Sequence, residues 1–312
     1  MIDRCYIEIT NVCNLHCDFC PGHTRAKRQL SLEEFDLLTD KIKGEVCFLY
    51  FHLMGEPLLH PLLPEFIAMA RQKGFKTVLT SNGTLLARTI DLLHALPHKI
   101  QLSLHSHESN VHRLSLPDYV HQVMRFALQA AREGTCVVLR LWNQGGRDKE
   151  NEALVSLLRE HVPLPWTERP DGYRLRQNLY LEFDRKFRWP SLDEEADGAA
   201  ATANQSTLSP RSTGGPQLFC KALSKQIGIL ADGSVVPCCL DHNGDVILGN
   251  LLGQQTLFDI LSSPRARAMT EAFSHHTASE PFCRTCESAL AHNSFRGKTR
   301  KSGDKKGNQL ER

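Results

Sequence analysis

Three cysteines near the start of this 312-residue chain offer its most distinctive chemistry. Cys13, Cys17 and Cys20 have the spacing CxxxCxxC, which can wrap three thiolates around one metal centre. A structural zinc ion would take a fourth ligand, for which His16 and His23 lie nearby in the sequence. A four-iron cluster held by three thiolates would instead leave one iron open to another molecule. The residues alone leave both interpretations open.

Four further cysteines form a second, more widely spaced set. Cys220 and Cys238 are separated by 17 residues, and the pair Cys283 and Cys286 follows 44 residues after Cys238. Four thiolates can fully ligate an iron–sulfur cluster or a zinc ion. Cys239 adjoins Cys238, but neighbouring side chains of an extended segment point to opposite faces. We therefore expect Cys238, and not Cys239, to be the ligand.

Between the two cysteine sets, short polar motifs end a series of apolar runs. They are Met54-Gly55-Glu56-Pro57, Ser81-Asn82-Gly83, Ser103-Leu104-His105 and Arg140 within Val-Leu-Arg-Leu-Trp-Asn. A carboxylate and backbone carbonyls suit a charged amine, and glycine allows close approach of the backbone. A charged residue inside an apolar strand needs a partner. Taken alone, Gly55-Glu56-Pro57 could also form an ordinary turn, and Arg140 could belong to a structural ion pair.

The elements that carry these motifs alternate regularly. We expect strands at residues 4–10, 46–53, 76–80, 100–104 and 136–142, with one more at 178–183. We expect helices at residues 31–43, 62–73, 85–96, 117–133 and 149–161, the first opened by a capping box of Ser31 and Glu34. Repeated strand–helix alternation predicts parallel strands with crossover helices, in an α/β barrel or an open sheet.

Taken in order along these strands, the motifs resemble those of the radical S-adenosylmethionine (radical SAM) enzymes. The resemblance covers roughly residues 4–143, with Met54 and His105 in place of the family's glycine and aspartate. It implies a partial (β/α)6 TIM-like barrel. It also implies a [4Fe-4S] cluster on the three clustered cysteines, whose fourth iron is chelated by SAM. One-electron reduction would cleave SAM to a 5′-deoxyadenosyl radical that abstracts a substrate hydrogen.

The same resemblance assigns SAM contacts to the strand-end motifs. Gly55 and Glu56 would receive the ammonium group of SAM, and Ser81 and Asn82 would lie beside the cofactor. Ser103 would meet its ribose or carboxylate, and Arg140 would pair with the carboxylate. No general base can be assigned. His105 and residues 178–189 are expected only as lining of the cavity.

The C-terminal cysteines resemble the twitch domain, a shortened form of the SPASM extension. The four-cysteine twitch of radical dehydrogenases that oxidise an alcohol is the most similar. This implies a small α+β domain with one auxiliary [4Fe-4S] cluster on Cys220, Cys238, Cys283 and Cys286, and an oxidation as the reaction. It also implies an electron donor such as flavodoxin or ferredoxin. The expected division is a core at 1–190, a flexible linker at 191–217, the auxiliary domain at 218–290 and a polar basic tail at 291–312.

Composition excludes several classes of protein. The net charge of +2 gives no strong basic footprint for nucleic acid, and the apolar runs are too short to span a membrane. Eleven cysteines without an export signal favour metal or redox chemistry in the cytoplasm over disulfides. Two alternatives stay open: an enzyme that modifies a peptide or protein, and a non-catalytic protein with two zinc–cysteine sites. A small molecule and a peptide are both possible substrates.

Overall fold

The computed structural model describes residues 2–88, 90–110, 114–192 and 218–289. The linker and the basic tail expected from the sequence fall almost wholly outside these ranges. The described residues divide into two compact units. One comprises Met1–Lys186 with Ala222–Arg267, and the other comprises Phe187–Lys221 with Ala268–Arg312. The first unit therefore contains both the expected barrel and the first part of the expected auxiliary domain.

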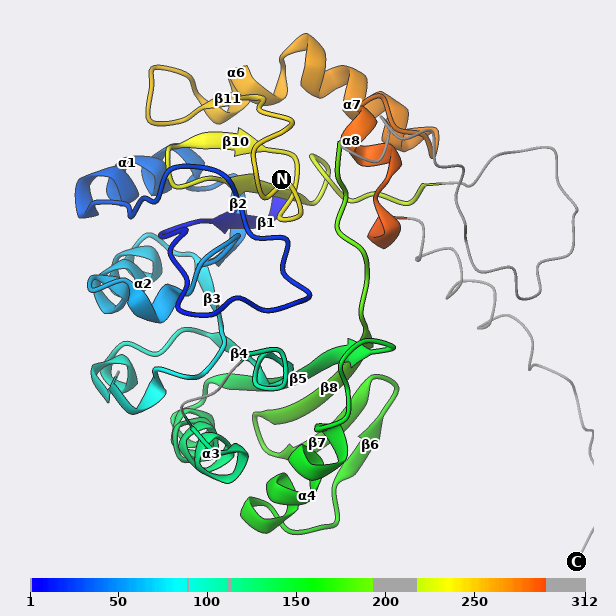
Figure 1. Ribbon diagram of the computed structural model, residues 1–312. Helices are drawn as coiled ribbons and strands as arrows, with labels where there is room; N and C mark the ends of the chain where they lie inside the picture. Colours follow the sequence, from blue (N-terminus) through cyan, green and yellow to red (C-terminus); the bar gives the residue numbers. More distant parts are fainter. Residues whose placement is uncertain (1, 89, 111–113, 193–217, 290–312) are drawn as a thin grey trace, which may run out of the picture. The chain divides into compact units, whose positions relative to one another are not determined.

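The first unit is built on a sheet of eleven strands in the order β11-β10-β9-β1-β2-β3-β4-β5-β8-β7-β6. The strands expected from the motifs are β1 (Ile2–Ile7), β2 (Val46–Tyr50), β3 (Lys76–Ser81), β4 (Lys99–Ser103), β5 (Cys136–Gln144) and β8 (Leu179–Arg185). These six strands are parallel neighbours. The fold class is thus the partial α/β barrel expected, drawn in Figure 1.

Crossover helices α1 (Leu32–Ile42), α2 (Leu63–Gln72), α3 (Leu116–Arg132) and α4 (Asn151–His161) line one side of this sheet (Figure 1). Helix α1 begins with the capping box predicted from Ser31 and Glu34. The segment at 85–96 differs from the sequence prediction. Instead of one α-helix it forms two short 3-10 helices, η2 (Leu86–Arg88) and η3 (Ile90–His94).

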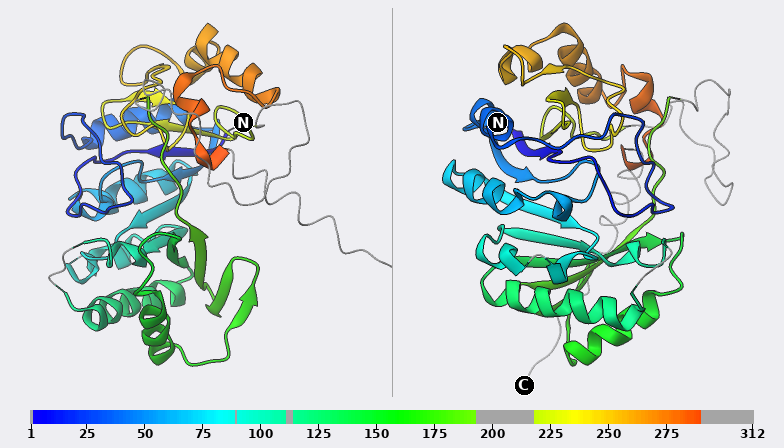
Figure 2. Two further views of the ribbon diagram at one scale, coloured as in Figure 1. Left: turned by 45° about the vertical axis from the view of Figure 1, so that its right-hand side comes forward. Right: turned by 60° about the vertical axis from the view of Figure 1, so that its left-hand side comes forward.

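Five strands join the edges of this parallel core. At one edge, β9 (Gln226–Ile229) lies parallel to β1, and β10 (Ser234–Val236) and β11 (Gly249–Asn250) follow in antiparallel pairing. At the other edge, β6 (Thr167–Arg169) and β7 (Gly172–Arg176) extend β8 as an antiparallel ribbon. The first hairpin after residue 222 therefore continues the barrel sheet (Figure 2).

The two faces of the parallel strands differ in chemistry. One face is apolar and buried, with residues such as Leu49, Leu79 and Leu139. Because side chains alternate along a strand, the residues between them share the opposite face. In register on that opposite face, Tyr6 pairs with Tyr50 and Arg140 lies between Ser103 and Glu182. The polar face is therefore where a site can form.

Three short helices complete the described chain. Helix α6 (Leu257–Leu261) belongs to the first unit, α7 (Pro264–Ser274) runs from the first unit into the second, and α8 (Pro281–Arg284) lies in the second. Among the described residues, no helix has the length and apolar character needed to cross a membrane.

Candidate active site

The first three cysteines lie on a loop between β1 and α1 whose two ends are tied together. Thr10 pairs with Gln29, and the Leu30 amide donates to the Ile9 carbonyl at 2.9 Å. The Asn11 side chain closes the same stem, donating to the Ala26 carbonyl at 2.8 Å. The stem is fixed from within, so the cysteines are presented at the tip of a closed loop.

The three thiols are close enough to influence one another electrostatically. Burial raises the pKa of Cys17 to about 12; a hydrogen bond from Asn110 opposes this shift, and the neighbouring Cys20 and Cys13 add to it. Burial also raises the pKa of Cys13 and of Cys20. Thiols in this state stay protonated near neutral pH unless a metal centre draws off the proton. Three soft sulfur donors on one loop suit iron–sulfur or zinc chemistry.

The structure does not gather these thiols onto a single point. Within the described ranges, no three histidine, cysteine, aspartate or glutamate side chains are grouped as ligands of one metal ion. Two histidines were considered as zinc ligands. The backbone amide of His16 donates to Asn110 Oδ1 at 2.9 Å. The His23 Nε2 atom contacts the Asn11 carbonyl at 2.8 Å, and its buried Nδ1 has no partner among the described residues.

Gly55 brings the loop after β2 against the cysteine loop. Its φ is +79°, and a Cβ atom there would lie 2.4 Å from the Thr10 carbonyl oxygen. The next amide, that of Glu56, donates to the Val12 carbonyl at 2.9 Å. Only glycine allows this backbone conformation at such close approach. The expected role of Gly55 in permitting close contact therefore has a steric basis in this fold.

Glu56 is a buried acid held by neutral donors. Its carboxylate accepts hydrogen bonds from the Leu58 amide at 3.0 Å and from the Asn82 amide at 2.8 Å. Burial raises its pKa to about 7, although bonds from Asn82, Leu58 and Ser81 act in the opposite direction. No lysine or arginine in the described part of the chain forms an ion pair with it. A buried carboxylate of this kind is suited to an ammonium group from a ligand.

Asn82 joins Glu56 to the cysteine loop. Its side-chain nitrogen donates to Asn14 Oδ1 at 3.0 Å, and its carbonyl accepts the Tyr119 hydroxyl at 2.8 Å. The neighbouring Ser81 hydroxyl accepts the Gly83 amide at 3.0 Å. The structure therefore brings the Gly55-Glu56 motif and the Ser81-Asn82 motif together beside the first cysteine set.

Arg140 lies on the polar face of the sheet and has an unused donor. Its guanidinium stacks over Trp142 with Cζ 3.9 Å from the ring centroid, and its buried Nε has no hydrogen-bond partner among the described residues. Burial lowers its pKa to about 10, and Glu182 is the strongest of the groups that oppose this shift. Arg140 stays charged at neutral pH, so its guanidinium can donate hydrogen bonds to the carboxylate expected at this position. Ser103 is its register partner on β4.

Aromatic residues that the motifs did not indicate share this polar face. The rings of Tyr6 and Tyr50 lie 4.7 Å apart, and that of His52 lies 5.6 Å from Tyr6. Burial, and then the charge of Arg140, lower the pKa of His52 to about 3, so this imidazole is neutral. His52 Nδ1 is buried without a partner among the described residues. The alternation of Tyr50, the last residue of β2, with His52 two positions later is the available sequence signal.

His105, expected as cavity lining, is buried against the cysteine loop. Its ring lies 4.8 Å from that of Phe19, and the Trp142 amide lies 3.3 Å from its Nδ1 atom. Burial lowers its pKa to about 4. The imidazole is therefore neutral near pH 7, and it takes the place of the negative charge that an aspartate would bring here.

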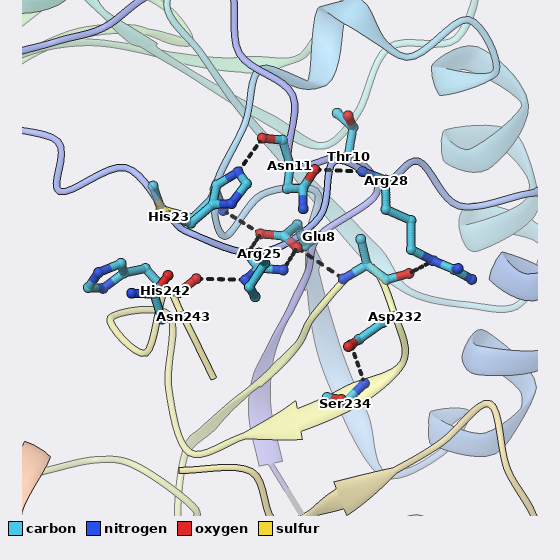
Figure 3. A network of polar contacts seen from close by, with 12 residues as sticks. Glu8, Thr10, Asn11, His23, Arg25, Arg28, Asp232, Ser234, His242 and Asn243 are labelled. Carbon is cyan, nitrogen blue, oxygen red and sulfur yellow. Dashed lines mark hydrogen bonds and ion pairs between the residues drawn. The ribbon is translucent and has the colours of Figure 1, made fainter. Parts of the chain in front are cut away.

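An ion pair absent from the sequence prediction fastens the far side of the cysteine loop. Arg25 donates from both terminal nitrogens to the buried Glu8 carboxylate, at 2.7 and 2.6 Å. The same carboxylate accepts the Met54 amide at 3.2 Å and the Ala231 amide at 3.0 Å. Arg25 Nε also donates to the His242 carbonyl at 2.9 Å (Figure 3). Glu8 thus joins the cysteine loop, the loop before Gly55 and the β9–β10 turn.

The four auxiliary cysteines fall in different units of the chain. Cys238 follows β10 in the first unit. Cys220, Cys283 and Cys286 belong to the second unit, where Cys283 is buried on α8 and the Cys286 amide lies 3.4 Å from its carbonyl. Cys239 packs against the apolar cluster of Tyr6, Leu53, Met54, Leu230 and Val236 in the first unit.

Comparison with protein families identifies both parts of the chain. Residues 7–158 match the model described as the Radical SAM superfamily, and residues 220–287 match the SPASM model, described as an iron–sulfur cluster-binding domain. This chain belongs to the radical SAM superfamily. It carries a C-terminal SPASM domain. The cofactors of the superfamily are a [4Fe-4S] cluster and SAM, and the SPASM domain binds auxiliary iron–sulfur.

Curated relatives are similar to this chain in sequence, and solved structures are similar to it in fold. The chain is 28% identical over 280 residues to GTP 3′,8-cyclase of Chlorobaculum tepidum, covering 81% of this chain and 83% of the relative. It is 27% identical over 258 residues to PqqA peptide cyclase of Streptomyces rochei, covering 74% and 68%. Its fold resembles BtrN in complex with AdoMet and 2-DOIA, with a TM-score of 0.53, 16% identity and coverage of 92% and 93%. It also resembles anSMEcpe with bound AdoMet and Cp18Cys peptide, with a TM-score of 0.58, 15% identity and 95% of each chain.

Proposed function

We propose that this radical SAM enzyme holds its first [4Fe-4S] cluster on Cys13, Cys17 and Cys20 and binds SAM between that loop and the polar face of the sheet. When bound, the cluster and SAM supply a 5′-deoxyadenosyl radical that abstracts a hydrogen atom from the substrate. The chain's own residues bind SAM, orient it and exclude water. An electron donor such as flavodoxin or ferredoxin would reduce the cluster in the cytoplasm.

The observation that carries this proposal is the buried Glu56 carboxylate. It lies beside the cysteine loop, it has two backbone donors and no cationic partner among the described residues, and its pKa is about 7. The ammonium group of SAM would supply the missing positive charge. Arg140, with its free Nε, would receive the carboxylate of SAM, and Gly55, Ser81, Asn82 and Ser103 would line the space between them.

The proposed reaction is an oxidation assisted by an auxiliary [4Fe-4S] cluster on Cys220, Cys238, Cys283 and Cys286. Four thiolates leave no iron open to bind the substrate. Because an oxidation needs an acceptor for the electron of the substrate radical, this cluster would take that role. The functional division into a radical core at 1–190 and an auxiliary domain at 218–290 is part of this proposal. A small molecule bearing an alcohol is the first candidate substrate.

Modification of a peptide is the second candidate. It is favoured by the similarity to a relative named PqqA peptide cyclase and by the likeness in fold to anSMEcpe, whose structure contains a bound peptide. Incubation of the reduced enzyme with SAM in deuterated buffer, with either candidate peptides or small alcohols, would separate the two. Substrate-dependent formation of 5′-deoxyadenosine identifies the class.

The proposal is tested by anaerobic reconstitution with iron, sulfide, reductant and SAM, followed by measurement of 5′-deoxyadenosine. The wild-type chain should form it, and single alanine variants of Cys13, Cys17 and Cys20 should not. Alanine variants of Cys5 and Cys47, which lie on β1 and β2, serve as matched controls and should retain activity. Undiminished product from the three loop variants would contradict the assignment.

A further inference from the structure

Asn110 uses every hydrogen-bonding group of its side-chain amide near the cysteine loop. Its Oδ1 accepts the backbone amide of His16 at 2.9 Å. Its Nδ2 donates to the Ser106 carbonyl at 2.7 Å and to the sulfur of Cys17 at 3.2 Å. A primary amide has two N–H donors and one carbonyl acceptor. Both N–H donors and the carbonyl acceptor of Asn110 therefore have partners, and one of these partners is a thiol sulfur.

The partners fix which way this amide points. The His16 amide can only donate, so it must face the oxygen of Asn110 and not the nitrogen. The Ser106 carbonyl can only accept, so it must face the nitrogen. The reverse orientation would set donor against donor and acceptor against acceptor. An N–H group is therefore directed at the Cys17 sulfur by its surroundings.

The turn that carries Asn110 is itself held in place. Within it, the Asn110 amide donates to the His107 carbonyl at 3.2 Å. The His107 ring is buried, its Nδ1 lies 2.7 Å from a Glu150 carboxylate oxygen, and it stacks on Tyr119 with a centroid separation of 5.0 Å. The donor that faces Cys17 is therefore fixed before any ligand binds.

We propose that Asn110 sets the reduction potential of the first cluster by donating this hydrogen bond to Cys17. The inference rests on the proposed role of Cys17 as a cluster ligand. Reduction adds one electron, supplied by the external one-electron donor, and makes no covalent bond in the protein. The added negative charge spreads partly onto the ligand sulfurs, where an N–H dipole stabilises it. The hydrogen bond therefore makes the cluster easier to reduce.

The test is a redox titration of the anaerobic full-length protein, followed by EPR. The signal that changes when SAM is added identifies the first cluster. Asn110→Leu removes the donor with little change in size, and Asn110→Asp keeps an acceptor for His16 while placing an oxygen toward the sulfur. Asn243→Leu is the matched control, because the Asn243 side chain accepts the Thr24 amide of the same loop at 2.9 Å and has no hydrogen bond to a cysteine among the described residues.

Both Asn110 variants should titrate at a more negative potential than the wild type, and the aspartate variant should show the larger shift. At a fixed solution potential, the ratio of reduced to oxidised cluster should fall about threefold or more in Asn110→Leu, as expected for one hydrogen bond. Asn243→Leu should titrate as the wild type.

Three results would overturn the inference. They are unchanged potentials in fully loaded Asn110 variants, equal shifts in Asn110→Leu and Asn243→Leu, and failure of both Asn110 variants to load a cluster that Asn243→Leu loads. The last would assign Asn110 to assembly and not to potential. A wild-type chain with no SAM-sensitive iron–sulfur signal would instead contradict the proposed function itself.

Discussion

The Glu8 carboxylate and the Arg25 guanidinium form a two-bond ion pair, with N–O distances of 2.7 and 2.6 Å, in the interior of the first unit. Glu8 directly follows the last residue of β1, and Arg25 lies on the cysteine loop. Since Glu8 also accepts the Met54 and Ala231 amides, one carboxylate connects three segments that are distant in the sequence.

Glu8→Gln should therefore destabilise the protein strongly. Removing one partner of a buried ion pair costs about 3–5 kcal/mol, because the other charge is left buried. The matched control is Glu34→Gln, which alters the more exposed pair with Arg28 and should cost less than about 1 kcal/mol. Urea unfolding followed by tryptophan fluorescence gives both values. Equal unfolding midpoints for the two variants would show that the Glu8–Arg25 pair does not stabilise the fold.

Gly55→Ala should disrupt the contact between the Gly55 loop and the cysteine loop. Its Cβ would lie 2.4 Å from the Thr10 carbonyl oxygen, so the backbone must move. Gly44→Ala is the matched control, because Gly44 also has a positive φ but its Cβ would meet nothing within 4 Å. The control should lose about 1 kcal/mol from backbone strain alone. Unfolding midpoints and iron content should both fall further in Gly55→Ala, and similar losses in the two variants would refute the steric argument.

Glu56 should make the SAM-free protein less stable as the pH rises. Its pKa is about 7 in the folded protein against an ordinary 4.5, so between these values the folded state holds a proton that the unfolded state has released. Stability then falls with increasing pH over that window, by on the order of 3 kcal/mol in total. Glu56→Gln lacks this titration.

The measurement is unfolding of both proteins at pH 5 and pH 8 without SAM. The wild type should lose stability relative to Glu56→Gln between the two values, and addition of SAM should reverse part of the loss. If the difference between the proteins does not change with pH, the carboxylate does not titrate as the buried acid described above.

Arg140→Met should weaken SAM binding while leaving the fold intact. A hydrogen bond between charged groups contributes about 1.5–3 kcal/mol, which corresponds to a loss of affinity of roughly 10-fold to 100-fold. Arg159→Met is the control, because Arg159 also lies over a tryptophan, Trp166, but is exposed on α4. Calorimetry of the anaerobic proteins gives both affinities. Equal affinities for the two variants would remove Arg140 from the SAM site.

Much of the parallel core could be predicted because its strands are buried and read as apolar runs. Strand β2 and helix α1 were recognisable from such a run and from the Ser31–Glu34 capping box. The ribbon strand β6 was missed, since Thr167, Glu168 and Arg169 are all exposed and give no apolar pattern. The pairing of β9 with β1 joins residues more than 200 positions apart, which no local pattern reports.

The candidate site, like the fold, could be predicted from the sequence only in part. Glu56 and Asn82 were singled out because their motifs resemble those of radical SAM enzymes, and the structure joins the two residues through a hydrogen bond of 2.8 Å. The contact from Asn110 to Cys17 and the pair of Glu8 with Arg25 depend on tertiary packing, so spacing along the chain gives no sign of them. An acid at the end of an apolar strand was the one hint of Glu8.

The most direct test of the central claim is a count of iron and acid-labile sulfide per chain in anaerobically reconstituted protein, with and without the three loop cysteines. Two four-iron clusters predict about eight irons in the wild type and about four after Cys13, Cys17 and Cys20 are all replaced by alanine. The variant should also lose the EPR signal that responds to SAM. A wild-type chain that contains zinc in place of iron, or a variant that keeps all its iron, would contradict the account.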